Sequence, residues 1–264
     1  MTNNNAPIGV MDSGVGGLSV VLALQKVLPQ EDIVYYGDTA NCPYGNKTKD
    51  ELLSLSGNML AFLQERGVKC VALACNTTSS LADLLRPRFT VPIITVAECA
   101  ADAIVRSGLK SVGLIATRFT VASGIYENRI HAVDPTVQVE SVGSAELARL
   151  VEHCAPEDPA VLAEIQSCMT ELLQKAPLHD VILGCTHYPL VKAQFEACCP
   201  GVRFLDPAPH QALVVKEFLA EKGLLRPTRR AKLTVYTTGE PETFRRICTQ
   251  NGLSDYYDTE YRKL

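Results

Sequence analysis

The sequence predicts an α/β protein made of two similar domains, each built on a parallel β-sheet. Short apolar segments typical of strands alternate with longer amphipathic segments typical of helices. This alternation is typical of parallel sheets covered by helices on both faces. The apolar segments are mostly continuous, as expected for strands that are buried on both sides. A faint internal repeat also indicates that the two halves share one architecture.

The predicted strands recur along most of the chain. They are Pro7–Met11, Ile33–Tyr36, Lys69–Ala74, Ile93–Val96, Ser111–Ala116, Val137–Ser141, Asp180–Leu183, Arg203–Leu205 and Lys232–Tyr236. Helices are predicted between most of them, for example Gly17–Leu28, Asp50–Arg66, Thr78–Arg86 and Ala160–Lys175.

The internal repeat consists of two pairs of matching segments. IGVMDSGVGGLSV resembles VGLIATRFTVAS at an offset of 105 residues, counted from Asp12 to Thr117. VALACNT resembles VILGCTH at an offset of 110 residues, counted from Cys75 to Cys185. We therefore predict a first domain from residues 1–97 and 210–264 and a second from residues 98–209. Because ligands of open α/β sheets bind beyond the carboxyl ends of strands, the active site is expected in the cleft between the domains.

Composition excludes several functional classes. The net charge is −4, so nucleic acid is not expected as a partner. The first ten residues show no signal peptide, and no apolar segment approaches the ~18 residues of a membrane span. A cytoplasmic protein is expected, and its ten cysteines are predicted to be thiols. No CxxC pair occurs, which argues against a structural metal site.

The segment MDSGVGGLSV predicts a glycine-rich turn between a strand and a helix. Such turns let backbone amides approach an anion at the helix N-terminus. The pattern does not match a nucleotide-binding motif. The alternative is a tight turn that is capped by Asp12 or Ser13.

Two cysteines occupy equivalent places in the two halves. Cys75 follows a predicted strand and precedes a helix, whose N-terminus lowers the pKa of a thiol. Cys185 holds the same place in the second half, with His187 two residues later. Either cysteine alone would be read as a buried apolar residue. Together, with Asp12 and His187 as helpers of Cys75 and Cys185 respectively, they predict two opposed bases that move a proton between the faces of one carbon.

These residues resemble the glutamate racemases of the aspartate/glutamate racemase family, and the resemblance covers nearly the whole chain. The matching motifs are Asp12-Ser13-Gly14 with Gly16-Gly17, Gly37-Asp38-Thr39, Pro43-Tyr44-Gly45, Ala74-Cys75-Asn76-Thr77, Thr117 and Thr120, Gly184-Cys185-Thr186-His187-Tyr188-Pro189, and TTGEPETF from Thr237 to Phe244.

The resemblance implies a racemase, an isomerase that works without cofactor or metal. Cys185 would take the α-proton from L-glutamate and Cys75 from D-glutamate. Substrate contacts would come from Asp12, Ser13, Pro43, Tyr44, Gly45, Cys75, Asn76, Thr77, Thr117, Thr120, Cys185, Thr186 and His187. The product would supply D-glutamate for peptidoglycan, and hence for cell-wall biogenesis and cell shape. A homodimer is expected.

The family also places a glutamate near the second cysteine, and Glu152 in LARLVEHC is the nearest match. The alternative is a carboxylate on the surface of a helix, because Val142–Ala145 departs from the usual preceding segment. Cys42 directly precedes Pro43 and is expected to be a spectator thiol close to the pocket.

Other functions remain open at this point. A racemase of aspartate is the nearest alternative. A non-catalytic α/β protein could bind an acidic amino acid. A cysteine hydrolase could use Cys185 and His187, although the sequence offers no third residue to orient His187. A zinc enzyme would need three or four converging ligands.

Overall fold

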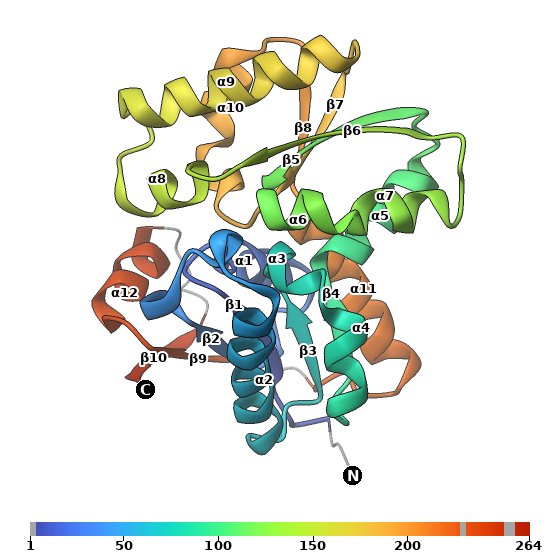
Figure 1. The fold of residues 1–264 in the computed structure, drawn as a ribbon. Coiled ribbons are helices and arrows are strands. Elements are labelled where there is room, and N and C mark those ends of the chain that lie inside the picture. The colour runs from blue at the N-terminus through green and yellow to red at the C-terminus, as the bar shows by residue number, and fades with distance from the viewer. Residues whose placement is uncertain (1–3, 228–230, 251–256) are drawn as a thin grey trace.

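The computed structural model describes residues 4–227, 231–250 and 257–264, and it contains two parallel β-sheets (Figure 1). The first sheet has the order β10 (Asp258–Lys263), β9 (Lys232–Thr237), β2 (Ile33–Gly37), β1 (Ile8–Asp12), β3 (Cys70–Leu73) and β4 (Ile93–Thr95). The second has the order β6 (Gln138–Ser144), β5 (Ser111–Thr117), β7 (Asp180–Gly184) and β8 (Arg203–Leu205). Every pair of neighbouring strands is parallel. The predicted fold class is therefore confirmed.

Helices cover both sheets. The longer ones are α1 (Leu18–Val27), α2 (Lys49–Glu65), α5 (Val96–Ser107), α9 (Pro159–Lys175), α11 (Ala208–Glu221) and α12 (Pro241–Gln250). The short ones are α3 (Asn76–Ser79), α4 (Ala82–Leu85), α6 (Arg118–Ser123), α7 (Ile125–His131), α8 (Leu147–His153) and α10 (Lys192–Cys198). Single 3₁₀ turns are η1 (Thr39–Asn41), η2 (Tyr44–Asn46), η3 (Arg86–Arg88) and η4 (Tyr188–Val191).

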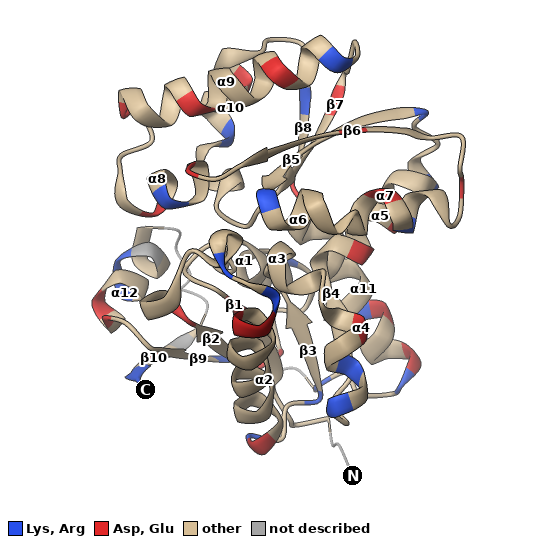
Figure 2. Ribbon diagram, viewed as in Figure 1, with Lys and Arg blue, Asp and Glu red and all other residues tan. Residues whose placement is uncertain are grey.

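Each sheet is buried on both faces, which explains the continuous apolar strands. In the first sheet, Val10 and Ala72 belong to one apolar cluster, and Met11 and Leu73 belong to another. Successive side chains of a strand point to opposite faces, so the two clusters lie on opposite sides of the sheet. Charged residues of both signs are interspersed over both domains (Figure 2), in keeping with the small net charge of −4.

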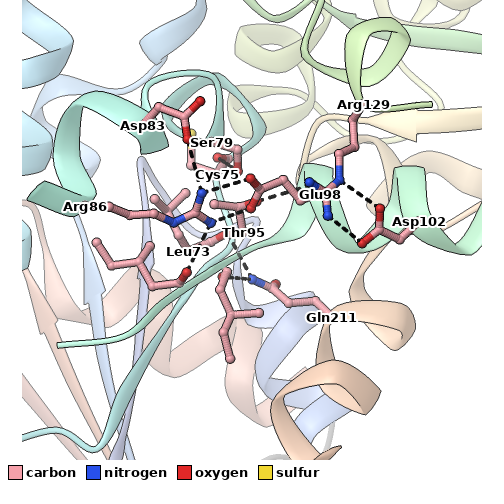
Figure 3. A network of polar contacts seen from close by, with 12 residues as sticks. Leu73, Cys75, Ser79, Asp83, Arg86, Thr95, Glu98, Asp102, Arg129 and Gln211 are labelled. Carbon is pink, nitrogen blue, oxygen red and sulfur yellow. Dashed lines mark hydrogen bonds and ion pairs between the residues drawn. The ribbon is translucent and has the colours of Figure 1, made fainter. Parts of the chain in front are cut away.

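The chain passes between the two sheets twice, through α5 after β4 and through α11 after β8. Polar contacts join these passages (Figure 3). The Arg86 guanidinium pairs with Glu98 near the start of α5. On α11, the Gln211 amide donates to the carbonyl oxygens of Leu73 at 3.0 Å and Ile94 at 2.8 Å. Gln211 thus ties the second passage to β3 and β4, and Arg86 holds the start of the first. The domain boundaries at 97/98 and 209/210 stay a prediction.

Two local differences from the predicted elements have physical causes. The helix predicted over Thr78–Arg86 begins two residues earlier and is divided into α3 and α4. The hydroxyls of Ser79 and Ser80 donate to carbonyl oxygens one turn back, a contact that weakens regular helix. Strand β10 was not among the predicted strands, because its sequence, DTEYRK, is polar and, among the described residues, it lies at the edge of the sheet beside β9.

In the described part of the chain, every helix is too short or too polar to span a bilayer.

Candidate active site

One nearly closed cavity lies between the carboxyl ends of strands from both sheets. Its lining comes from Ser13, Pro43, Tyr44, Gly45, Cys75, Asn76, Thr77, Thr117, Ala148, Cys185, Thr186 and His187. Its volume is about 10 Å³, room for about one water molecule. Eleven of the thirteen predicted substrate contacts are brought together here. Asp12, Thr120 and Glu152 lie behind the lining residues and hold them, and Ala148 is a lining residue that the motifs did not indicate.

Asp12 fixes the glycine-rich turn and also contacts the second domain. Its buried carboxylate accepts hydrogen bonds from the amides of Gly14 at 3.1 Å and Gly17 at 3.0 Å. It accepts a third from the Thr186 hydroxyl at 3.1 Å. Burial raises the pKa of Asp12, although these hydrogen bonds and the charge of His187 oppose the rise. The predicted capping of the turn and a contact across the cleft are therefore combined in one side chain.

Cys75 is a neutral thiol in this closed arrangement. It lies at the end of β3, is 4% exposed, and donates from Sγ to the Ser13 hydroxyl at 3.8 Å. Burial, and then the charge of Asp12, raise the pKa of Cys75 to about 12. Hydrogen bonds from Thr78 at the start of α3 lower the pKa, as the helix position predicted, but burial outweighs them. The side chain is thus a proton donor.

Cys185 has a charged partner, and a third residue orients that partner. The Sγ atom of Cys185 lies 3.7 Å from Nδ1 of His187. On the other side of the ring, Nε2 of His187 contacts the carboxylate of Glu152, which projects from α8. The Glu152 side chain is only 11% exposed, so the surface-carboxylate alternative is wrong. The contact between Glu152 and His187 has no signal in the sequence, because the two residues are 35 positions apart.

The charges of His187 and Glu152 are set by effects that oppose one another. Burial alone would lower the pKa of His187, but hydrogen bonds to Cys185, Cys42 and Glu152 outweigh it and raise the pKa well above its usual value. Burial alone would raise the pKa of Glu152, but the contact with His187 leaves it lowered. The pair is therefore an imidazolium and a carboxylate, and the imidazolium lies beside the sulfur of Cys185.

Hydroxyl groups meet across the cleft. Thr77 Oγ1 of the first domain lies 3.0 Å from Thr117 Oγ1 of the second. Thr120, at 2.9 Å from Thr117, stands behind it. Asn76 accepts a hydrogen bond at 2.7 Å from the hydroxyl of Tyr126, a buried positioning residue that the motifs did not include. These neutral groups can donate to carboxylate oxygens without placing a cation in the cavity.

Asp38 positions the Pro43-Tyr44-Gly45 loop, a role that its motif did not reveal. Its carboxylate accepts from the hydroxyls of Tyr44 at 2.5 Å and Thr238 at 2.7 Å. Burial, and then this hydrogen bond, raise the pKa of Tyr44, so its hydroxyl stays protonated. Thr237 Oγ1 also lies 2.9 Å from Thr39 Oγ1. The motif TTGEPETF thus holds the segment that leads into the Pro43-Tyr44-Gly45 loop. The C-terminal segment supports one wall of the cavity.

The match to known proteins agrees with this geometry. Residues 8–214 match the model of the family described as Asp/Glu/Hydantoin racemase. A glutamate racemase from Thermus thermophilus is 39% identical over 256 residues, which is 96% of this chain and 95% of that protein. The crystal structure of glutamate racemase isoform RacE1 from Bacillus anthracis superimposes with a TM-score of 0.91 at 30% identity, covering 99% of this chain and 98% of that one. The structure of a glutamate racemase from Francisella tularensis in complex with D-glutamate gives a TM-score of 0.88 at 29% identity, with coverage of 99% and 97%.

A family match over most of the chain, a relative at 39% identity and a shared two-domain fold all agree with two thiols facing one cavity. The chain therefore belongs to the Asp/Glu/Hydantoin racemase family and is a racemase.

Proposed function

We propose that the chain interconverts L- and D-glutamate by moving the α-proton between Cys75 and Cys185, without a cofactor. The observation that carries the proposal is the placement of the two thiols. They come from the carboxyl ends of β3 and β7, in different domains, and line the same cavity. The names of the relatives, and the D-glutamate complex of one of them, support glutamate as the substrate.

The two thiols would act in turn. A Cys185 thiolate, held beside the His187 imidazolium, removes the α-proton of L-glutamate. The neutral Cys75 thiol donates its proton to the opposite face of the same carbon, and D-glutamate leaves. The reverse reaction starts with Cys75 as the thiolate. Burial, and then the charge of Asp12, raise the pKa of Cys75, so a thiolate at Cys75 is a stronger base than an ordinary thiolate.

The carbanion-like state between the two transfers needs electrostatic stabilisation. Hydroxyl groups at the cavity, namely those of Ser13, Thr77 and Thr117, would donate to the substrate's carboxylates. The hydroxyls of Tyr44 and Thr186 donate to Asp38 and Asp12 and hold the walls of the cavity in place. Preorganised donors in a water-poor site are worth far more than the same donors in water. The contacts among them, such as Thr77 with Thr117, would be exchanged for contacts with substrate.

A cavity of about 10 Å³ is too small for glutamate, so the domains must separate to admit it. Gly16 lies at the contact that must open and close. A Cβ atom added there would lie 2.7 Å from the carbonyl carbon and from Oγ1 of Thr186 in the other domain. Only a residue without a side chain fits when the cleft is closed.

We expect Gly16→Ala to lower kcat/KM for glutamate by about 10²-fold, because a misplacement of ~1 Å in a catalytic site has an effect of that order. The thermal midpoint should change little. The control is Gly57→Ala on α2, where an added Cβ would meet only the flexible end of Arg88, at 3.1 Å. Steady-state rates of both variants test this. Equal rates for the two alanine variants would contradict closure through Gly16.

We expect Glu152→Gln to lower kcat by about 10- to 100-fold, because a hydrogen bond to a charged group contributes roughly 1.5–3 kcal/mol. Without the carboxylate, the pKa of His187 falls, so the imidazolium is lost at a lower pH. The alkaline limb of the kcat/KM profile should therefore move to lower pH. A profile unchanged from wild type would show that Glu152 does not act through His187.

The proposed activity is tested with purified protein and glutamate in deuterated water, without added cofactor. Circular dichroism follows inversion, and NMR follows deuterium entering at the α-carbon. Both should proceed with either enantiomer, and aspartate should react much more slowly. A requirement for pyridoxal phosphate, or binding of glutamate without exchange, would refute the proposal.

A cysteine hydrolase is the second candidate, because Glu152 supplies the third residue that a Cys185–His187 pair would need. Hydrolysis through Cys185 would leave Cys75 without a role. Release of ammonia from glutamine that survives Cys75→Ser would favour this candidate over the racemase.

We also propose the setting of the reaction. D-glutamate from this enzyme would supply peptidoglycan synthesis in the cytoplasm, and the working form would be a homodimer that binds neither nucleic acid nor membrane. Light scattering of the purified protein tests the dimer.

A further inference from the structure

Three different metal-ligand types converge at the edge of the cavity. The Sγ atom of Cys42, a carboxylate oxygen of Glu152 and a ring nitrogen of His187 all lie within 4.8 Å of one another. Cys42 Sγ is 3.8 Å from Glu152 Oε2. His187 is buried, and the other two are only partly exposed. Cys42 comes from the loop before Pro43 in the first domain, and its two partners come from the second.

The neighbouring backbone leaves room beside these atoms. Gly14 has no side chain, and a Cβ added to it would lie 3.0 Å from Cys42 Sγ and 3.2 Å from Glu152 Oε2. Cys42 and Glu152 thus border a space that an alanine at position 14 would fill. The racemisation scheme assigns Cys42 no proton transfer and does not require this space.

The donor set selects one class of cation. Sulfur, imidazole nitrogen and carboxylate oxygen are the ligands of Zn²⁺, at about 2.3, 2.0–2.1 and 2.0–2.2 Å. Tetrahedral bonds of that length place the donor atoms roughly 3.3–3.8 Å apart. The three donors here need to shift by no more than about 1 Å. Magnesium, which prefers oxygen ligands in an octahedron, does not suit the set.

We propose that Cys42, Glu152 and His187 form an inhibitory site for Zn²⁺ or a similar borderline divalent cation, with a fourth position left for water. The cation would replace the hydrogen between His187 Nε2 and Glu152. It would also join the two domains through Cys42, holding the cleft closed. Both effects oppose turnover, so this is a site of inhibition and not of a catalytic metal.

Cobalt absorption tests the site independently of the racemase proposal. Co²⁺ added to the metal-free protein should give the intense sulfur-to-cobalt charge-transfer band of thiolate ligation, together with the visible bands of a tetrahedral ion. Cys42→Ser should lose the charge-transfer band, while Cys75→Ser, Cys185→Ser and the control Cys198→Ser should keep it. Thermal unfolding of each variant confirms that it is folded.

The inhibition experiment rests on the proposed function and uses free Zn²⁺ set by a chelator buffer. Each protein's racemisation rate is compared with its own metal-free rate. We expect Cys42→Ser to need at least tenfold more free Zn²⁺ for half-inhibition than wild type or Cys198→Ser, and Mg²⁺ to have no effect. If the cobalt band survives in Cys42→Ser and disappears in Cys75→Ser or Cys185→Ser, the cation binds the catalytic thiols and the proposal is wrong. A cobalt band without any racemase activity would uphold the site and refute the proposed function.

Discussion

Replacing either Cys75 or Cys185 with serine is expected to lower kcat for glutamate racemisation by about 10²–10⁴-fold in both directions, the range of a lost acid–base group. Each direction needs one sulfur as base and the other as acid. A serine hydroxyl ionises far less readily than a thiol, whose reference pKa is ~8.5, so it serves poorly as the base. The two variants should therefore be similarly slow in overall turnover, although their environments differ.

Isotope exchange should separate the roles of the two cysteines. In Cys75→Ser, the Cys185–His187–Glu152 group is intact and can still remove the α-proton of L-glutamate. This variant should exchange deuterium into L-glutamate faster than it inverts it. Cys185→Ser should show the same behaviour with D-glutamate. Chiral chromatography with mass spectrometry measures both quantities.

The control is Cys198→Ser, a thiol on α10 whose Sγ contacts Gln166 and not the cavity. It should keep the wild-type rate. Wild-type turnover in either catalytic variant would contradict the two-base scheme, and exchange preferring the other enantiomer would reverse the assigned roles.

The sequence was sufficient to predict every described strand except β10, and the places of the two cysteines, because both signals are local. A few consecutive apolar residues are enough to predict a buried parallel strand. The polar residue that follows the strand then lies at the carboxyl edge of the sheet. Cys75 and Cys185 both follow such strands and both line the cavity. The order of strands within each sheet has no comparable local signal.

Contacts between distant residues were not predictable in this way. Asp38 and Thr238 are 200 positions apart and meet only because β2 pairs with β9. The state of Cys75 was also missed, because the N-terminus of α3 is a local feature whereas burial between two domains is not. Local patterns thus identified the two cysteines that line the cavity, while the ionisation and positioning of the side chains there depend on contacts between the two domains.

The first sheet supplies one wall of the cavity, and it is also stabilised at the amino ends of its strands, on the side away from the cavity. Lys69 precedes β3 and pairs with Glu31, which precedes β2, and both side chains are fully buried. Lys69 Nζ also donates to the carbonyl oxygen of Leu224 at 2.9 Å, and Glu31 accepts from the amide of Arg226 at 2.9 Å. These contacts lie at the amino ends of the strands, opposite the cavity. They join the segment after α11 to the sheet.

We expect Lys69→Met to lower the free energy of unfolding by about 3–5 kcal/mol, because it leaves the buried Glu31 carboxylate without its cation. The control is Lys110→Met, which removes the partner of Asp134 where the lysine side chain is 71% exposed. Such a surface pair contributes only about 0–1 kcal/mol. Urea unfolding of both variants measures the difference.

The double variant Lys69→Met/Glu31→Gln shows whether the stability is lost through the unpaired Glu31 charge or through the missing hydrogen bonds of Lys69 Nζ. Glutamine keeps an oxygen that can accept from the Arg226 amide but carries no charge. If the unpaired carboxylate causes most of the loss, the double variant will be more stable than Lys69→Met alone. An equally unstable double variant would instead assign the loss to the hydrogen bonds of Lys69 Nζ with backbone carbonyls. In either case the folded fraction should keep the wild-type kcat, because the pair acts on the sheet as a whole and contacts none of the residues that line the cavity.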